Sequence, residues 1–465
     1  MDTILDYVRW MGDLDFKQKP LCDLDIWVLC QIGYLDMKPV FFVNGGTPDV
    51  TNDRPGEDGS DETALGEEAE LAVGASGKLV SKASPSQGLT VRTICRRIKD
   101  QGLRYNIRTV GPDAGQQELQ DVIAASKRFG MVKVRDYVDE FDPDQALQFS
   151  AMTFEVGDRR IISYCGTDHT IAGWKEDFMI SFTHTASQEK AVAYAEREAR
   201  KAARFGRKLV ISGHSKGGNL ALYAGCMMAD RYWKAVESVY VLDGPGLCPE
   251  VADLSKVKRI DEKTIHFSPE YAIVSKLFPV DLKHKVIVKA EGEGLDQHAL
   301  YRWGVDHGQP LTVEKHDAGS DTFESVFSRW MDGLSQEDRE HFVDQFFDAI
   351  SNNGQAITLD DIGADGGPKI EEILANMLKM DGESRKVTKE LTEAVISDLL
   401  EKVTRTAEES VRTVQAEAKR VQEEVQSEAK KAGDKAKRVL KKAVAEAGNA
   451  LKAVAKKSEE QQKNS

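Results

Sequence analysis

One stretch decides the fold of this chain of 465 residues: Lys208-Leu209-Val210-Ile211-Ser212-Gly213-His214-Ser215-Lys216-Gly217-Gly218. Its first five residues are typical of a short buried strand, and the residues from Asn219 onward have the pattern of a helix. Between them lies the spacing Gly-x-Ser-x-Gly, in the strand–turn–helix context of a nucleophile elbow. The flanking glycines leave room for the tight, strained turn that such a serine occupies. We therefore predict that Ser215 is a nucleophile held above the edge of a sheet.

Two other roles for this turn remain open, a phosphate-binding turn and a plain connection between a strand and a helix. The phosphate-binding turn is disfavoured because Lys216 is followed by Gly217 rather than by Ser or Thr, so no Walker A sequence is present. The strand and helix on either side favour the nucleophile over the plain connection.

The residues around this stretch alternate between short β-branched or apolar runs and longer segments with helical periodicity. We predict a hairpin from two runs at residues 147–154 and 160–164, separated by Gly157-Asp158, and a helix at 188–205. Further strands are expected at residues 208–212, 238–242, 264–267 and 285–289. Strands separated by helices indicate an α/β fold, with a mostly parallel sheet covered by helices on both faces.

A nucleophilic serine needs a base, and in this kind of fold the histidine follows the last strands. His298 comes shortly after the predicted strand at residues 285–289, whereas His307 and His316 lie farther along the chain. We therefore predict that His298 is the general base. His214 is the neighbour of the nucleophile, and we expect it to pack or to form a hydrogen bond under the sheet.

The third member of the site is expected to be a carboxylate that orients the imidazole ring. Asp243 ends the predicted strand at residues 238–242, and Glu270 lies just beyond the strand at residues 264–267. Both positions are at the carboxyl ends of strands, where α/β sheets gather their functional residues. The pattern alone leaves both candidates open.

An acyl-transfer site also needs backbone donors for the oxyanion. We predict that the Lys216 N–H, directly after the nucleophile, is one donor. The second donor is expected at Thr167, in the turn that follows the strand at residues 160–164. An ordinary turn at the end of a strand is the alternative for Thr167.

The composition of the chain changes several times along its length. We predict an N-terminal helical part of the main domain at residues 1–43, a disordered acidic insertion at 44–88 and an α/β core at 89–313. A helical extension is expected at residues 314–384 and a charged amphipathic helical tail at 385–465. In residues 403–454, small apolar residues recur in steps of four, four and three, which predicts one long helix. Three roles remain open for this tail: a solvated, partly helical segment, a helix that pairs with a second copy as a coiled coil or with a partner, or a helix that contacts an anionic membrane surface.

Several motifs together resemble known families. Similarity to the class 3 lipases of the α/β-hydrolase superfamily is carried by Gly166-Thr167, Gly173-Trp174-x-x-Asp177 and Gly213-His214-Ser215-Lys216-Gly217-Gly218-Asn219-Leu220-Ala221. A closer resemblance, to the bacterial Mbeg1-like family, is carried by Asp6-Tyr7-x-x-Trp10, Asp243-Gly244-Pro245-Gly246 and Gln297-His298 with Trp303 after it. The resemblance covers about residues 1–43 and 89–305.

This resemblance implies an α/β-hydrolase fold, with Ser215 as the nucleophile and His298 as the base. Class 3 lipases carry their acid in an Asp-x-Val-Pro stretch after the strand that precedes the histidine, where this chain has Ala272-Ile273-Val274-Ser275. The Asp-Gly-Pro-Gly element of the closer family therefore favours Asp243, with Glu270 as the alternative. Cys165 stands where class 3 lipases commonly have an arginine.

The leading hypothesis is a lipase-like serine hydrolase that cleaves a small-molecule ester or lipid without a cofactor or metal. The alternative is a non-catalytic α/β-hydrolase scaffold whose helical tail binds a partner. A formal net charge of −14, from 63 Lys and Arg against 77 Asp and Glu, argues against a nucleic-acid-binding protein.

The compartment is expected to be the cytoplasm. The first six residues are acidic where a secretory signal would be basic, and no apolar run approaches the roughly 18 residues of a membrane span. The six cysteines are scattered without a Cys-x-x-Cys pair, which is typical of reduced thiols rather than of disulfides or a zinc site.

Overall fold

The computed structural model describes the greater part of the first 352 residues and four residues beyond them. The described residues are 1–41, 71–73, 79–81, 88–101, 114–142, 147–166, 171–292, 294–332, 334–352, 376, 380, 382 and 384. The chain divides into two units, Met1–Asp398 and Leu399–Ser465, and every described residue belongs to the first. The predicted tail at residues 385–465 therefore lies outside the described residues.

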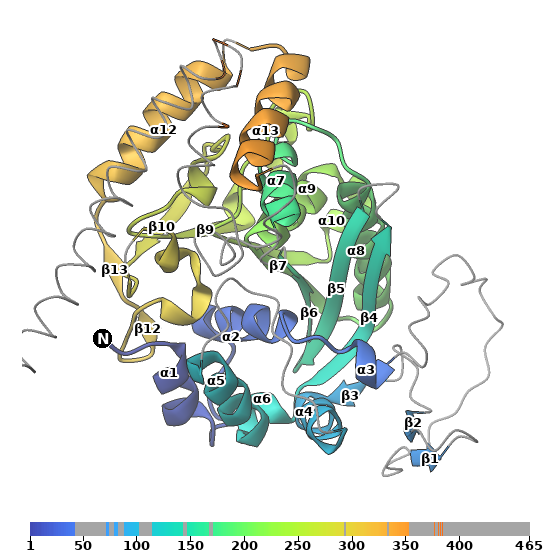
Figure 1. The fold of residues 1–465 in the computed structure, drawn as a ribbon. Coiled ribbons are helices and arrows are strands. Elements are labelled where there is room, and N and C mark those ends of the chain that lie inside the picture. Colours follow the sequence, from blue (N-terminus) through green and yellow to red (C-terminus); the bar gives the residue numbers. More distant parts are fainter. Residues whose placement is uncertain are drawn as a thin grey trace, which may run out of the picture. The chain divides into compact units, whose positions relative to one another are not determined.

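The centre of the first unit is a mixed sheet that contains nine strands in the described part of the chain (Figure 1). Their order is β13 (Thr312–Val313), β10 (His284–Val288), β9 (Thr264–Pro269), β8 (Val236–Leu242), β7 (Lys208–His214), β6 (Arg159–Tyr164), β5 (Leu147–Val156), β4 (Lys133–Asp142) and β3 (Leu89–Thr90). The five strands from β10 to β6 run parallel, and the strands at both edges are antiparallel. The predicted α/β arrangement with a mostly parallel central sheet is confirmed.

The predicted strands all form, and the hairpin of β5 and β6 turns at Gly157-Asp158 as expected. Strand β4, which the sequence analysis did not predict, pairs antiparallel with β5. Its register shifts between Arg135 and Val138, and Asp136 there has a φ of 54°. This bulge breaks the two-residue alternation that marks a strand in sequence.

Helices cover both faces of the sheet and bury two separate apolar clusters (Figure 1). One face carries α8 (Ala186–Arg204), α9 (Lys216–Met227), α10 (Asp230–Trp233) and α11 (Val257–Ile260). The other carries α1 (Ile4–Met11), α2 (Asp23–Gly33), α3 (Lys38–Phe41), α4 (Val91–Asp100), α5 (Ala114–Ala125) and α6 (Lys127–Gly130). Helix α8 begins at a capping box in which the Thr185 side chain accepts from the Gln188 N–H.

The N-terminal segment is fixed to the rest of the domain by a buried ion pair. Arg128 of α6 and Asp25 of α2 are both fully buried, and the two guanidinium bonds to the carboxylate measure 2.6 and 2.7 Å. Arg128 also donates to backbone carbonyls at residues 14, 15, 19 and 20. Helix α2 is thereby held against β5, β6 and β7.

A further group of helices lies near the carboxyl ends of the central strands. It comprises α7 (Ile171–Met179), α12 (Ala318–Met331) and α13 (Gln336–Ile350). Phe178 of α7 makes edge-to-face contacts with Phe327 of α12 and Phe347 of α13. Helices α12 and α13 lie within the predicted helical extension at residues 314–384. Most of the rest of this extension is outside the described residues.

The remaining described elements are short. They are β1 (Leu71–Val73), β2 (Leu79–Ser81), β11 (Val305–Asp306) and β12 (Gln309–Pro310), with the 3₁₀ turns Leu254–Lys256, Asp261–Lys263, Val274–Lys276, Gly294–His298 and Leu300–Arg302. Strands β1 and β2 pair with each other inside the predicted insertion at residues 44–88, whose other residues lie outside the description except for Gly88. Its disorder stays a prediction.

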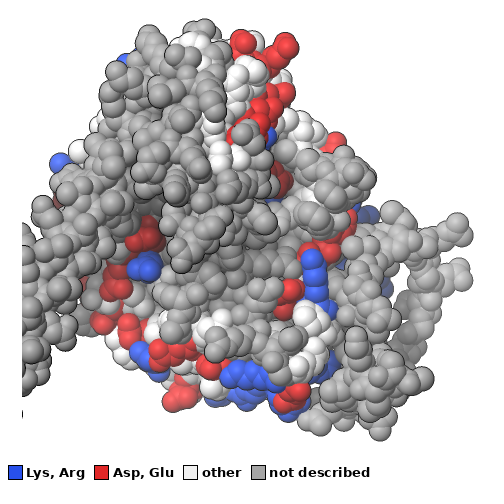
Figure 2. All heavy atoms as spheres, viewed as in Figure 1, with Lys and Arg blue, Asp and Glu red and all other residues white. Residues whose placement is uncertain are grey.

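The face drawn in Figure 2 carries charged side chains of both signs among the described residues. Acidic side chains gather at the top of the view, and acidic and basic side chains lie together along its lower edge. Within the described part of the chain, no helix is long and apolar enough to cross a membrane.

Candidate active site

The turn between β7 and α9 has the geometry of a nucleophile elbow. Ser215 has a φ of 60° and a ψ of −129°, a strained combination for a residue with a side chain. Its N–H donates to the Leu242 carbonyl of β8 at 3.0 Å. A Cβ on Gly213 would lie 2.0 Å from the Gly217 oxygen, and a Cβ on Gly217 would lie 2.1 Å from the Tyr164 oxygen. The two glycines therefore allow the backbone approach that the turn requires.

The structure brings Ser215, His298 and Asp243 into one hydrogen-bonded chain. The Ser215 hydroxyl lies 2.9 Å from Nε2 of His298, and Nδ1 of His298 lies 2.6 Å from Oδ2 of Asp243. Because a carboxylate only accepts, the His298 proton is on Nδ1 and Nε2 is free to accept from the serine. The three residues are 6%, 8% and 1% exposed, so the chain lies just beneath the surface.

Asp243 is held in its ionised form by its surroundings. Its backbone has a φ of 41°, and its N–H donates to the Phe267 carbonyl of β9 at 2.7 Å. Oδ1 accepts from the Ser275 N–H at 3.2 Å. Burial opposes the charge, but the hydrogen bond and charge of His298 and the bond from Ser275 hold the pKa of Asp243 below its ordinary value.

The loop after Asp243 is fixed by Asn219, which stands on the first turn of α9. Its amide Nδ2 donates to the carbonyls of Pro245 and Gly246 at 3.2 and 2.8 Å. Its Oδ1 in turn accepts from the Gln188 amide at 3.1 Å. The helix that carries the serine therefore also positions the loop that carries the carboxylate.

The other candidate residues lie apart from the hydrogen bonds that link Ser215, His298 and Asp243. Glu270 is half-buried, and its backbone bonds to Val288 and Asp317; among the described contacts, Nδ1 of His298 bonds to Asp243 rather than to Glu270. His307 is exposed and contacts Asp306. His316 bonds through Nε2 to the hydroxyl of Ser268 at 2.9 Å.

The loop of His298 is held by hydrogen bonds to two successive carbonyls. Trp303 Nε1–H donates to the Gln297 carbonyl at 2.9 Å, and His214 Nε2 lies 2.8 Å from the His298 carbonyl. The Gln297 side chain accepts from the Tyr271 N–H at 2.8 Å. The position of the His298 ring is therefore set by its backbone as well as by its bond to Asp243.

Tyr34, at the end of α2, is a residue that the sequence analysis missed. Its hydroxyl lies 2.6 Å from Nδ1 of His214, although the two residues are 180 positions apart in the chain. The rings of His214 and His298 are stacked, with centroids 4.6 Å apart and planes inclined by 29°. No local spacing links Tyr34 to the elbow, so no pattern in the sequence could have found it.

The side chain of Lys216 is buried beside the elbow. Nζ bonds to Oε2 of Glu176 in α7 at 2.8 Å and to the carbonyl of Gln148 at 3.0 Å. The Lys216 N–H stands at the start of α9, where the first N–H groups of a helix have no partner within the helix. Thr167, the other predicted oxyanion donor, lies outside the described residues.

These features define an α/β protein in which a serine, a histidine and an aspartate are linked by hydrogen bonds at the carboxyl edge of the parallel strands. Residues 123–348 match the family model described as Mbeg1-like, and the predicted resemblance to this family is confirmed. The family is related to the lipase-like α/β-hydrolases. A comparison with curated proteins found no match. Among the described residues, no group of three or more His, Cys, Asp or Glu is arranged to hold a metal ion.

Proposed function

We propose that this protein is a serine hydrolase of the lipase and esterase class, which cleaves a carboxylic ester through an acyl-enzyme on Ser215. His298 Nε2 takes the proton from the Ser215 hydroxyl as its oxygen attacks the ester carbonyl carbon. The same proton then passes to the alkoxide that leaves. A water molecule, deprotonated by His298, attacks the acyl carbon, and the acid is released with Ser215 restored.

The observation that carries this proposal is the chain of two hydrogen bonds from Ser215 through His298 to Asp243, at 2.9 and 2.6 Å. A serine hydroxyl is a weak nucleophile unless a base takes its proton. The positive φ of Ser215 is a second support, since strained backbone at a buried polar residue is costly and tends to mark functional sites. Asp243 would stabilise the imidazolium that forms when His298 takes the proton.

The oxyanion of the tetrahedral intermediate would rest on backbone donors. The Lys216 N–H is suited to this role because it points from the first turn of α9, at the positive end of the helix. The buried ion pair between Lys216 Nζ and Glu176 ties this turn to α7. Thr167, four residues before the start of α7 at Ile171, remains the proposed second donor.

A fluorophosphonate probe tests the proposal directly, because it reacts only with an activated serine. We expect the wild-type protein to be labelled and Ser215→Ala to remain unlabelled. Ser181→Ala is the matched control, since the Ser181 hydroxyl is buried and has no hydrogen-bond partner among the described residues. It should be labelled at the wild-type rate.

A panel of p-nitrophenyl esters from acetate to palmitate then identifies the acyl length, with small esters and lipids as the substrate classes in question. Labelling that persists in Ser215→Ala would assign the nucleophile elsewhere. Folded wild-type protein that neither reacts with the probe nor cleaves any ester would instead support a non-catalytic scaffold that binds a partner.

A further inference from the structure

We propose that Tyr34 and His214 form a positioning relay for His298, so that the N-terminal segment is an integral part of the active site. This inference rests on the proposed function and adds two residues that do not touch the substrate. The relay runs from the Tyr34 hydroxyl to Nδ1 of His214 at 2.6 Å, and from Nε2 of His214 to the His298 carbonyl at 2.8 Å. Tyr34 lies outside residues 123–348, which match the family model.

The direction of each hydrogen bond follows from the chemistry of its partners. A carbonyl oxygen only accepts, so Nε2 of His214 must carry the proton that faces the His298 carbonyl. In a neutral imidazole the other nitrogen is then an acceptor, and the Tyr34 hydroxyl donates its one proton to this Nδ1 at 2.6 Å rather than to the His214 carbonyl at 3.2 Å. Tyr34 thus selects the one tautomer of His214 that can hold the His298 backbone.

Both groups keep these protonation states in the folded protein. Burial, with a smaller contribution from the charge of His298, lowers the pKa of His214 to about 3, so the ring is neutral at ordinary pH. Burial also raises the pKa of Tyr34 well above its ordinary value, which keeps its proton on the hydroxyl. The carboxylates near the pair are Asp243 and Asp177, and the thiols near Tyr34 are those of Cys30 and Cys165.

A neutral His214 matters because its ring is stacked against the ring that becomes charged. The centroids of His214 and His298 are 4.6 Å apart. A second positive charge at that distance would oppose the imidazolium that forms on His298 when it takes the serine proton. A neutral ring in the same place supports the His298 ring without this repulsion.

The local backbone leaves space for the Tyr34 hydroxyl. A Cβ on Gly166, two residues beyond the end of β6, would lie 2.2 Å from this oxygen and 2.9 Å from the His214 carbonyl oxygen. The hydroxyl also lies 3.2 Å from the His214 carbonyl. It therefore occupies a gap between the end of β6 and the elbow, which only a residue without a side chain leaves open.

Tyr34→Phe removes the hydroxyl from the relay and leaves the ring in place. Tyr240→Phe is the matched control, because the Tyr240 hydroxyl also joins the sheet to α2, through Asp23 at 2.7 Å, but contacts neither histidine. We expect Tyr34→Phe to lower kcat and the rate of probe labelling by about tenfold or more, because small displacements of a base are costly, with KM changed by less than about twofold. Tyr240→Phe should keep kcat within about twofold of the wild type.

A readout that does not depend on turnover is the downfield NMR signal of the His298 Nδ1 proton, which is identified by its absence in His298→Ala. Tyr34→Phe should shift this signal and Tyr240→Phe should leave it in place. If the wild type shows neither labelling nor turnover, the proposed function fails, and the shift still tests the relay. A wild-type kcat and an unmoved signal in Tyr34→Phe would overturn the relay, as would equal losses of kcat in both tyrosine variants.

Substitution of His214 gives an independent test of the hydrogen bonds. The amide of His214→Gln can both donate to the His298 carbonyl and accept from Tyr34. The side chain of His214→Leu can do neither. We expect His214→Gln to retain several times the kcat of His214→Leu, whereas equal kcat values in two folded variants would contradict the relay.

Discussion

Buried charged groups are arranged differently at the two ends of strands β6 and β7. At the carboxyl end, Tyr164 is aligned with Gly213 of the elbow, and at the amino end Arg160 is aligned with Leu209. These positions are four residues apart, or about 13 Å along the strand. At the carboxyl end, the buried carboxylate of Asp243 lies beside two stacked histidines.

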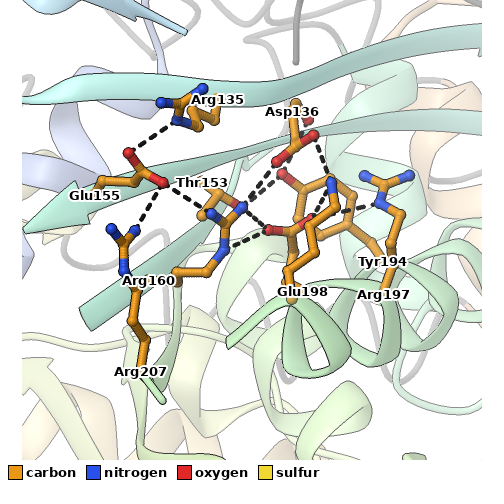
Figure 3. A network of polar contacts seen from close by, with 10 residues as sticks. Arg135, Asp136, Thr153, Glu155, Arg160, Tyr194, Arg197, Glu198 and Arg207 are labelled. Carbon is orange, nitrogen blue, oxygen red and sulfur yellow. Dashed lines mark hydrogen bonds and ion pairs between the residues drawn. The ribbon is translucent and has the colours of Figure 1, made fainter. Parts of the chain in front are cut away.

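The amino end holds a dense network of ion pairs instead (Figure 3). Arg160 lies at its centre and bonds to Glu198, Asp136 and Glu155, from α8, β4 and β5. Additional cations bond to the same carboxylates from Arg135, Arg197, Lys201 and Arg207. Each of these charges has its partner in place before any reaction starts.

The difference shows what each end is suited to do. The network joins three strands and a helix, and each of its charges is already paired with one of opposite sign. At the carboxyl end, the proposed reaction creates a charge on His298, where one carboxylate in a buried site interacts strongly with it. Both ends contain a residue with strained backbone, because Asp136 and Ser215 have φ of 54° and 60°.

The largest effect is expected at the carboxyl end, from loss of the base. His298→Ala should lower kcat/KM by about 10⁴-fold or more, since the serine would have no group to take its proton, and should lower Tm because buried Asp243 loses its partner. Steady-state kinetics and thermal unfolding measure the two quantities. His307→Ala is the control, because this exposed histidine contacts only Asp306 in the described structure. Full activity in His298→Ala would assign the base to another residue.

The next effect tests which carboxylate orients the base. Asp243→Asn should lower kcat by about 10³- to 10⁴-fold, because the amide disfavours the tautomer of His298 that accepts from Ser215. Glu270→Gln should retain most of the wild-type kcat. A reversed order of the two variants would restore the lipase-like arrangement that the sequence left open.

This choice shows where sequence reasoning ends. The strand at residues 208–212 and the hairpin at 147–164 were predictable because their patterns are local. Asp243 and Glu270 could not be separated in this way, because both follow strands of the same sheet. Their difference depends on the contacts of β8 with β9, where the Asp243 N–H bonds to the Phe267 carbonyl.

The N-terminal segment shows the same limit more strongly. A helical character was predictable for residues 1–43, but the bond from Tyr34 to His214 depends on how α2 packs under the sheet. The network at the amino end was missed for a related reason, since the bulge in β4 hides the strand that supplies Asp136. Both sites are made by contacts between segments that are distant in the chain.

The third prediction concerns the amino end alone. Arg160→Met should lower the free energy of unfolding by about 3–5 kcal/mol, because it leaves the fully buried Glu198 without its main partner. The kcat of the folded variant should stay within about twofold, since the site is at the other end of the strands. Urea unfolding and kinetics below the transition measure the two effects.

Lys283→Met is the control for this stability effect, because the Lys283–Glu262 pair is exposed and a surface pair contributes little to stability. Equal losses of stability in the two variants would show that the network is no stronger than a surface pair. A loss of kcat in folded Arg160→Met would show that the two ends of the strands are coupled.

The smallest effect is a dependence of stability on pH. Burial opposes the charge of Glu155, but the hydrogen bond from Arg135 and the charges of Arg135, Arg207 and Arg160 hold its pKa below the ordinary value. The unfolded chain, with a glutamate pKa of about 4.3, therefore takes up the proton first as the pH falls. The stability that Glu155 contributes is complete above about pH 4.3 and is lost as the pH falls through the folded pKa.

Glu155→Gln should therefore lower the stability by about 1 kcal/mol at neutral pH, as expected for loss of a charged hydrogen bond. Its Tm should approach that of the wild type as the pH is lowered below about 4.3, because protonation removes the same charge from the wild type. Thermal unfolding of both proteins across this range measures the difference. Because Asp243 titrates with the same sign in both proteins, it cancels from the comparison. A Tm difference that stays constant down to acid pH would show that the stabilising contribution of Glu155 does not depend on its charge.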